Sequence, residues 1–286
     1  MNAVTFRQLV LFEQTLFGLP WVIASAALAL SNPSLSLPTF GTWLWIIVAF
    51  SAARSSGMAF NRLIDHEMDV KNPRTADRPL PRGLVTKTQV MAIAWTGVLL
   101  FLFACGMLNK LCLMMAPGAI LLIWAYSYTK RFTACCHFVL GSIQLLGSVF
   151  AWVAVTGEFS LASLFIGGAV FASIAGTDIV YALQDEEFDR SHRLLSIPVV
   201  LGKEGAIRLV RLLHLLAMVM LVQAGTYMQA GPLYFIGLIP VAATYLYYHV
   251  QLQAENPNQF FFRCNTQVAI VFLVTSIGVL VWQRSL

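Results

Sequence analysis

The chain has 286 residues, of which 58% are hydrophobic and only 11% are charged. A soluble globular domain carries roughly 25% charged residues, so this composition excludes an ordinary soluble enzyme and predicts an integral membrane protein. The formal net charge of +5 does not indicate a nucleic-acid-binding protein, because most of the chain is too apolar to present a basic face. Basic loops beside an anionic lipid bilayer explain the charge better.

Nine apolar segments are each long enough to cross a bilayer as a helix, which takes about 20 residues. Their apolar runs are continuous rather than alternating, which favours helices over a transmembrane barrel. We therefore predict an all-α, polytopic membrane helical bundle, with residues 1–286 forming a single integral-membrane domain. The predicted spans are residues 9–30, 42–65, 88–108, 111–129, 137–156, 160–184, 206–228, 232–252 and 265–284.

Basic residues gather in the loops that follow the second, fourth and sixth predicted spans. Cytoplasmic loops of membrane proteins carry an excess of Lys and Arg, so these loops and the N-terminus are predicted to face the cytoplasm, in a bacterial inner membrane. The residues concerned are Lys71, Arg74, Arg78, Arg82, Lys87, Lys130, Arg131, Arg190, Arg193 and Lys203.

A faint internal repeat places acidic residues at two of these cytoplasmic helix ends. The stretch "NRLIDHEMD" (61–69) contains Asp65 and Asp69, and "YALQDEEFD" (181–189) contains Asp185 and Asp189. Each stretch precedes a loop with proline and glycine, "PLPRG" or "SIPVVLG". Two pseudo-repeated halves that deliver equivalent groups to one side of a membrane indicate a shared site between them.

The spacing of these aspartates indicates a metal site. Residues four apart on a helix share a face, about 5–6 Å apart at Cβ, and two carboxylates at that distance repel each other. A hard divalent cation relieves this repulsion, and Mg²⁺ combines one or two carboxylates with water and substrate phosphate. We expect two such clusters, facing each other, to hold two metal ions astride a diphosphate. The alternative is that each acidic pair only forms salt bridges with nearby Arg and Lys.

Basic residues near the acidic pairs are candidates for binding phosphate. Arg74 and Arg78 lie in a segment whose prolines prevent a regular helix, so a loop is expected to fold them over the metal site. Arginine matches phosphate oxygens with two parallel hydrogen bonds. Lys130 follows Tyr126 by four residues at another cytoplasmic helix end, where phosphate contact and simple topological placement are both open.

Two polar residues lie deeper in the apolar spans. Arg54 precedes Asn61 by seven residues, and Asp178 precedes Asp185 by seven, so each is expected two helical turns below its motif on a similar face. A charged residue inside a membrane segment is a functional hypothesis by default. Arg54 and Asp178 either pair with each other or bind the substrate. The five histidines show no metal-ligand spacing and are given no role.

At these residues the sequence resembles the UbiA superfamily of membrane aromatic prenyltransferases. Asn61, Asp65 and Asp69 match its NxxxDxxxD motif, and "KNPRTADRPLPRG" (71–83) matches the continuation. The stretch "DIVYALQDEEFDRSHRLLSIPVVLG" (178–202) resembles the second motif. Arg193 departs from the pattern, because many members have a small residue or glycine there.

This resemblance implies transfer of an isoprenyl chain from a polyprenyl diphosphate to a small aromatic acceptor. It implies Mg²⁺ ligands at Asn61, Asp65, Asp69, Asp185 and Asp189. It further implies phosphate contacts from Arg74, Arg78 and Lys130 with Tyr126 and Tyr181 nearby, and Arg54 and Arg131 as candidates for an anionic group on the acceptor.

The acceptor is expected to be 4-hydroxybenzoate, because "FEQTLFGLP" and "ARSSGMAFNR" resemble the 4-hydroxybenzoate branch of the superfamily. A dihydroxynaphthoate of menaquinone biosynthesis is the close alternative. A phosphatidyltransferase is disfavoured, since its D-G-x-x-A-R signature does not occur in the sequence. A transporter is the remaining alternative, but its acidic residues should lie at the middle of the spans rather than at their ends.

Overall fold

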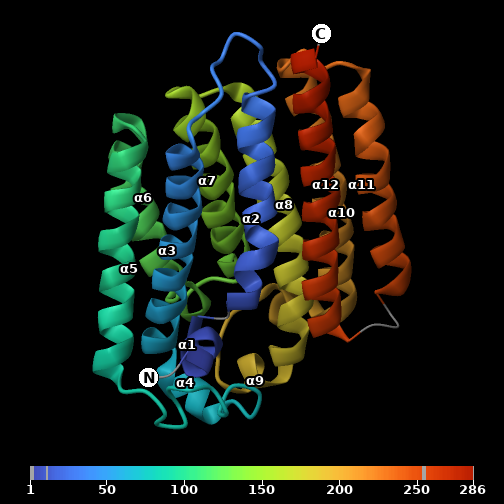
Figure 1. Ribbon diagram of the computed structural model, residues 1–286. Coiled ribbons are helices and arrows are strands. Elements are labelled where there is room, and N and C mark those ends of the chain that lie inside the picture. Colours follow the sequence, from blue (N-terminus) through green and yellow to red (C-terminus); the bar gives the residue numbers. More distant parts are fainter. Residues whose placement is uncertain (1–2, 11, 253–255, 286) are drawn as a thin grey trace.

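The computed structural model describes residues 3–10, 12–252 and 256–285, and this part of the chain folds into a bundle of helices (Figure 1). The helices are α1 (Ala3–Val10), α2 (Phe12–Ala29), α3 (Phe40–Ile64), α4 (His66–Lys71), α5 (Lys87–Leu108), α6 (Lys110–Tyr126), α7 (Cys136–Thr156), α8 (Leu161–Ala182), α9 (Glu186–Ser191), α10 (Ile197–Tyr227), α11 (Pro232–Gln251) and α12 (Pro257–Ser285). Two short 3₁₀ helices, η1 (Thr129–Arg131) and η2 (Leu183–Asp185), complete the set.

The predicted spans are confirmed as helices. Seven helical segments among the described residues are long and apolar enough to cross a membrane, and two shorter apolar helices, Gly18–Ala29 and Lys110–Tyr126, accompany them. Each of these nine segments overlaps one of the nine predicted spans. The first predicted span, 9–30, takes in the end of α1 and all of α2, and its residue 11 lies outside the described residues. Large apolar side chains such as Leu99, Leu121 and Ile239 are exposed on the outside of the bundle, where lipid would cover them. The protein is therefore an integral membrane protein with several spans.

The boundaries differ from the prediction at two helices of the second half. The helix α10 begins at Ile197 rather than at residue 206, because a first helical stretch is joined to the long helix across Gly202, whose φ is 66° and ψ is 173°. Pro198 stands at the start of α10, where its fixed φ suits a helix and its missing N–H costs nothing. The helix α12 begins at Pro257 rather than at residue 265. Its first turns contain polar residues, which lower the hydropathy there, but they are helical and continuous with the apolar part.

Three apolar cores fill the described part of the bundle. One is built mainly from α8, α10, α11 and α12, and a second from α3, α5, α6 and α7, while α2 contributes to both. A third, smaller core packs α3 against α5 and against the segment that precedes α5. The helix α8 is buried along most of its length. The neighbouring α7 approaches it closely at Gly141, where an added Cβ would lie 2.7 Å from the carbonyl oxygen of Phe171.

The short helices α4 and α9 lie at one end of the bundle, together with the loop that follows α4 (Figure 1). Both motifs singled out in the sequence therefore end at the same side of the molecule. The connection between α2 and α3 lies at the opposite end (Figure 1). This placement brings the two acidic repeats to one face, as the shared-site hypothesis requires.

Candidate active site

The two acidic motifs share a local backbone conformation. Asp65 lies between α3 and α4 with φ −93° and ψ 5°, and Asp185 is the last residue of η2, directly before α9, with φ −103° and ψ 2°. Each motif therefore interrupts its long helix at the first aspartate, which differs from the continuous helix expected from the spacing. The amide of Asp69 still donates to the carbonyl of Asp65 at 2.8 Å, so the second aspartate remains one turn away. The repeat seen in the sequence is a repeat of structure.

The segment after α4 folds as a chain of turns, as its prolines predict. The side chain of Asn72 accepts a hydrogen bond from the amide of Arg74 at 2.9 Å, and the hydroxyl of Thr75 donates to the carbonyl of Asp69 at 3.0 Å. These bonds fix the loop against the end of α4. They direct the guanidinium of Arg74 toward the other half of the protein.

Arg74 joins the first half of the protein to the second motif. Its Nε and Nη2 donate to the two carboxylate oxygens of Asp185 at 2.8 Å and 2.6 Å. Asn72 donates to the same carboxylate at 3.0 Å, and Arg74 also donates to the hydroxyl of Tyr181 at 3.0 Å. The carboxylate of Asp185 is therefore held almost entirely by residues of the first motif's loop.

The other three aspartates also have basic partners. Asp69 accepts from Arg78 at 2.7 Å and lies 4.0 Å from Arg62. Asp189 accepts from Lys130 at 3.0 Å. Asp65 accepts from Asn61 at 2.6 Å and lies 3.7 Å from Arg131. Each motif carboxylate thus lies within 4.0 Å of a basic side chain, as the salt-bridge alternative expects.

These ion pairs shift the acidity of the groups at the membrane surface. Burial raises the pKa of Asp65 to about 6, and the nearby Asp69 adds to this, while Arg131 and Lys130 oppose it. Burial disfavours the charge on Arg74 and on Lys130, but their contacts with Asp185 and Asp189 outweigh it and raise both pKa values. Arg74 and Lys130 are therefore held charged beside the aspartates.

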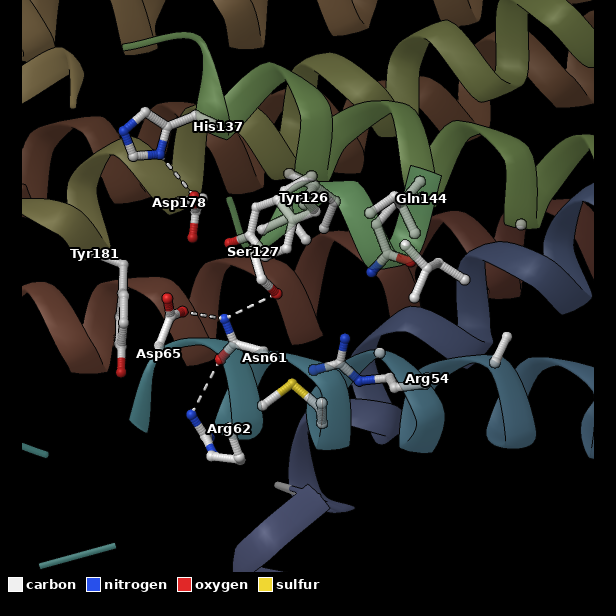
Figure 2. Close-up of a pocket in the computed structure, with 18 of the residues that line it drawn as sticks. Arg54, Asn61, Arg62, Asp65, Tyr126, Ser127, His137, Gln144, Asp178 and Tyr181 are labelled. Atoms are coloured by element: carbon white, nitrogen blue, oxygen red, sulfur yellow. Dashed lines mark hydrogen bonds and ion pairs between the residues drawn. The ribbon is translucent and has the colours of Figure 1, made fainter. Parts of the chain in front are cut away.

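All of these residues line one cavity of about 300 Å³ that reaches from the two motifs into the bundle. Its polar end contains the motif aspartates with their basic partners, and its inner walls are mostly apolar, with Phe50, Ile123 and Phe150 among them. Figure 2 shows Arg54 and Gln144 on the far side of Asn61 from Tyr181. The cavity thus has a charged mouth and an apolar interior.

The predicted site residues are brought together around this cavity. Its lining includes Arg54, Asn61, Asp65, Asp69, Arg74, Arg78, Tyr126, Lys130, Arg131, Asp178, Tyr181, Asp185 and Asp189. Of the two alternatives for the deep polar pair, the structure joins Asp178 to His137, at 2.6 Å, rather than to Arg54. His137, for which the sequence indicated no role, is thus the hydrogen-bonded partner of Asp178 in the cavity lining.

Three further polar residues of the site were not identified from the sequence. They are Arg62, Asn72 and Ser127, which contact Asp69, Asp185 and Asn61 respectively. Asn72 lies within the stretch "KNPRTADRPLPRG" (71–83), so its place in that motif could have marked it as a site residue. Arg62 directly follows Asn61, and Ser127 directly follows Tyr126. Adjacent residues on a helix face different directions, so the spacing of the motif does not predict that these two side chains reach the site.

The model of the UbiA prenyltransferase family matches residues 19–280 of the chain. The chain belongs to the UbiA prenyltransferase family. It is 28% identical over 240 residues to the 4-hydroxybenzoate octaprenyltransferase of Aeromonas salmonicida, covering 83% of each chain. It is 26% identical over 246 residues to the enzyme of the same name from Vibrio parahaemolyticus, covering 86% of each.

Solved structures of UbiA homologues share the fold. The apo structure of a UbiA homologue from Aeropyrum pernix K1 aligns with a TM-score of 0.84 at 27% identity, covering 93% of this chain and 98% of that one. A UbiA homologue from Archaeoglobus fulgidus, bound to DMAPP and Mg²⁺, aligns with a TM-score of 0.73 at 17% identity, covering 97% and 99%. The protein is thus a UbiA-family polyprenyltransferase, as the sequence motifs indicated.

The residues at the mouth fit a hard cation that carries a diphosphate. Carboxylate and amide oxygens are the donors that Mg²⁺ prefers, and five such side chains, Asn61 and the four motif aspartates, line one cavity. The described residues contain no group of three or more His, Cys, Asp and Glu side chains arranged to enclose a metal by themselves.

Proposed function

We propose that this polyprenyltransferase transfers a polyprenyl group from a polyprenyl diphosphate to 4-hydroxybenzoate in quinone biosynthesis, with Mg²⁺ as cofactor. The observation that carries this proposal is the single cavity that joins both acidic motifs to an apolar interior containing Arg54. The names of the curated relatives, at 26–28% identity, support the same acceptor.

The mouth of the cavity would hold the diphosphate. Asn61, Asp65, Asp69, Asp185 and Asp189 would hold Mg²⁺. When bound, Mg²⁺ would neutralise the diphosphate and stabilise it as a leaving group. Arg74, Arg78 and Lys130 would turn from the aspartates to phosphate oxygens, because a cation on the carboxylates frees the bases to bind the second anion. Tyr126 and Tyr181 stand beside them.

The interior would hold the reacting ends of the two substrates. Loss of diphosphate leaves positive charge on the prenyl chain, which water would quench, so apolar walls protect it. The aromatic faces of Phe50, Phe150 and Tyr126 line this space and would stabilise the charge. The remainder of the lipid chain would extend into the bilayer.

Arg54 is the best placed of the two candidate residues for the acceptor's carboxylate. It lies on α3 below the motif, inside the apolar part of the cavity, where a charged hydrogen bond is strong. Arg131 lies at the mouth, where it donates to the carbonyl of Ile64 at 2.7 Å and approaches Asp65. We therefore assign the carboxylate to Arg54 and the stabilisation of Asp65 to Arg131.

The basic loops support an orientation with the N-terminus and the site facing the cytoplasm of a bacterial inner membrane. Residues 1–286 would act as one integral-membrane domain.

The acceptor is tested by incubating membranes that contain the protein with polyprenyl diphosphate, Mg²⁺ and either radiolabelled 4-hydroxybenzoate or radiolabelled dihydroxynaphthoate. We expect a prenylated product from 4-hydroxybenzoate, and little product from Asp65→Ala, with Asp77→Asn as a control at an exposed aspartate outside the cavity. Product from dihydroxynaphthoate alone would favour the menaquinone-route alternative. No product from either acceptor would overturn the proposal.

A further inference from the structure

A hydrogen-bonded histidine and aspartate lie inside the cavity, apart from the aspartates at its mouth. His137 on α7 and Asp178 on α8 both line the cavity, and Nδ1 of His137 lies 2.6 Å from Oδ2 of Asp178. The two residues are 41 positions apart in the sequence and come from neighbouring helices. Neither residue is among those assigned above to the metal or to the diphosphate.

The surroundings of His137 determine which of its nitrogens carries the proton. The amide of Ile197 donates to Nε2 of His137 at 3.4 Å. Ile197 is the first residue of α10, so this amide has no partner within its own helix. In the neutral ring Nε2 is therefore the acceptor, and Nδ1 carries the proton that is donated to Asp178. The ring is held from both sides.

Asp178 presents its carboxylate to the cavity. The side chain of His137 is 1% exposed, whereas that of Asp178 is 15% exposed. Figure 2 shows one carboxylate oxygen directed at His137 and the other directed away from it, toward the space beside Tyr181 and Asn61. Among the described residues the second oxygen, Oδ1, has no hydrogen-bond donor.

Close packing of α7 on α8 maintains the distance between the pair. Gly141 is one turn after His137, and an added Cβ there would lie 2.7 Å from the carbonyl oxygen of Phe171 and 3.4 Å from Cβ of Ala175. The helices approach so closely at this point because Gly141 has no side chain. Asp178 is on the next turn of α8 after Ala175, so the contact fixes both partners.

The transfer reaction requires a proton acceptor in this part of the cavity. Attachment of a prenyl carbon to an aromatic ring carbon breaks the bond from the prenyl carbon to the diphosphate oxygen. The ring carbon then gives up its hydrogen as a proton, and the electron pair of that C–H bond restores the aromatic ring. An interior that excludes water must supply the base from the protein.

We propose that Asp178 accepts this ring proton and that His137 positions its carboxylate. This inference rests on the proposed function, because it requires an aromatic acceptor in the cavity. Asp178 is then a catalytic residue, with its free oxygen facing the acceptor. His137 is a positioning residue, which orients that oxygen through a hydrogen bond to the other one. The diphosphate leaves with the electron pair of its broken bond to the prenyl carbon.

The test uses the full-length protein in membranes, with 4-hydroxybenzoate that carries either hydrogen or deuterium at the two ring positions next to the hydroxyl group. The variants are Asp178→Asn, His137→Phe and His137→Asn, whose amide keeps a donor near the position of Nδ1. Asp77→Asn is the matched control, since Asp77 is exposed and does not line the cavity.

We expect Asp178→Asn to lower kcat roughly a hundredfold or more, the contribution of a general base. The KM for the prenyl diphosphate should change little. The isotope effect on kcat should become larger than in the wild type, because proton loss then limits the rate. His137→Phe should show the same trend to a smaller extent, and His137→Asn should restore part of the rate.

Three results would overturn the proposal: wild-type kcat in Asp178→Asn, a loss of kcat without any change in the isotope effect, or His137→Asn no better than His137→Phe. If the wild-type protein prenylates neither acceptor, the proposed function itself fails. In that case release of diphosphate from the prenyl substrate still shows whether the metal site works, so the two failures are distinguishable.

Discussion

The ion pair between Arg74 and Asp185 joins the two halves of the protein, and its removal should destabilise the end of the bundle that carries the site. Both oxygens of Asp185 are contacted, at 2.8 Å and 2.6 Å. Loss of one partner from a buried ion pair costs roughly 3–5 kcal/mol in the free energy of unfolding. The Arg74 side chain is 31% exposed. Solvent screening therefore reduces the expected loss to about 2 kcal/mol for Arg74→Gln or Asp185→Asn.

A double-mutant cycle isolates this interaction. The free energy of unfolding is measured by chemical denaturation in detergent, without metal or substrate, for both single variants and the double variant. We expect a coupling free energy of about 1–2 kcal/mol. Glu186 and Arg190, an exposed pair 2.9 Å apart on the same side of the molecule, serve as the control. An exposed pair one helical turn apart should couple by only about 0.3–0.5 kcal/mol.

The same cycle, repeated with Mg²⁺ and inorganic pyrophosphate, tests the exchange of partners. The coupling between Arg74 and Asp185 should then fall, because each residue would bind a ligand instead of the other. A coupling in the ligand-free protein no larger than that of Glu186 and Arg190 would refute the reasoning.

Three backbone predictions follow from conformations that the structure records. Gly202→Ala should lower the free energy of unfolding by about 1–3 kcal/mol, because a φ of 66° with a ψ of 173° is unfavourable for any residue with a Cβ. Gly106→Ala is the control, since an added Cβ there meets no atom within 4 Å, and it should not lower the free energy of unfolding. Gly141→Ala should lower the free energy of unfolding by about 1–3 kcal/mol and should also lower kcat, because the added Cβ would meet the carbonyl oxygen of Phe171. An unchanged free energy of unfolding would contradict the close contact. Arg193→Gly should raise the free energy of unfolding by about 1 kcal/mol, since Arg193 has a φ of 57°, which is unfavourable for a residue with a Cβ. A lower free energy of unfolding in the same denaturation assay would contradict this strain.

The spans and both acidic motifs were predictable because they depend on local sequence. Continuous apolar runs define the helices whatever their neighbours are. The four-residue spacing of Asp65 and Asp69 keeps them one turn apart whether the helix is continuous or interrupted. The interruption itself was not predictable, since neither proline nor glycine occurs in residues 61–70 or 181–190 to mark it. The start of α10 was also missed, because Lys203 and Glu204 lower the hydropathy of a segment that is still helical.

The pairing of charges depended on tertiary structure and was therefore not predictable. Arg74 lies close to Asp69 in sequence, but the turn at Asn72 directs it to Asp185. Lys130 pairs with Asp189 across 59 positions. His137 is a single polar residue at the start of an apolar helix, and nothing nearby in the chain indicates its partner.

The departure at Arg193 now has a structural explanation. This residue adopts the left-handed conformation that favours glycine, in the turn between α9 and α10. A small residue or glycine at the same place in many UbiA members suits that conformation. The departure affects the turn and leaves the charged residues of the mouth unchanged.

The central claim is that the aspartates of both halves together bind one Mg²⁺–diphosphate. The most direct measurement is calorimetric binding of inorganic pyrophosphate to the purified protein, with Mg²⁺ or with EDTA, in the wild type and in Asp65→Asn and Asp185→Asn. We predict binding that requires Mg²⁺ and that weakens at least about tenfold in each variant, since each loses a charged ligand from a shared site. Wild-type affinity in either variant, or equally tight binding in EDTA, would contradict the claim.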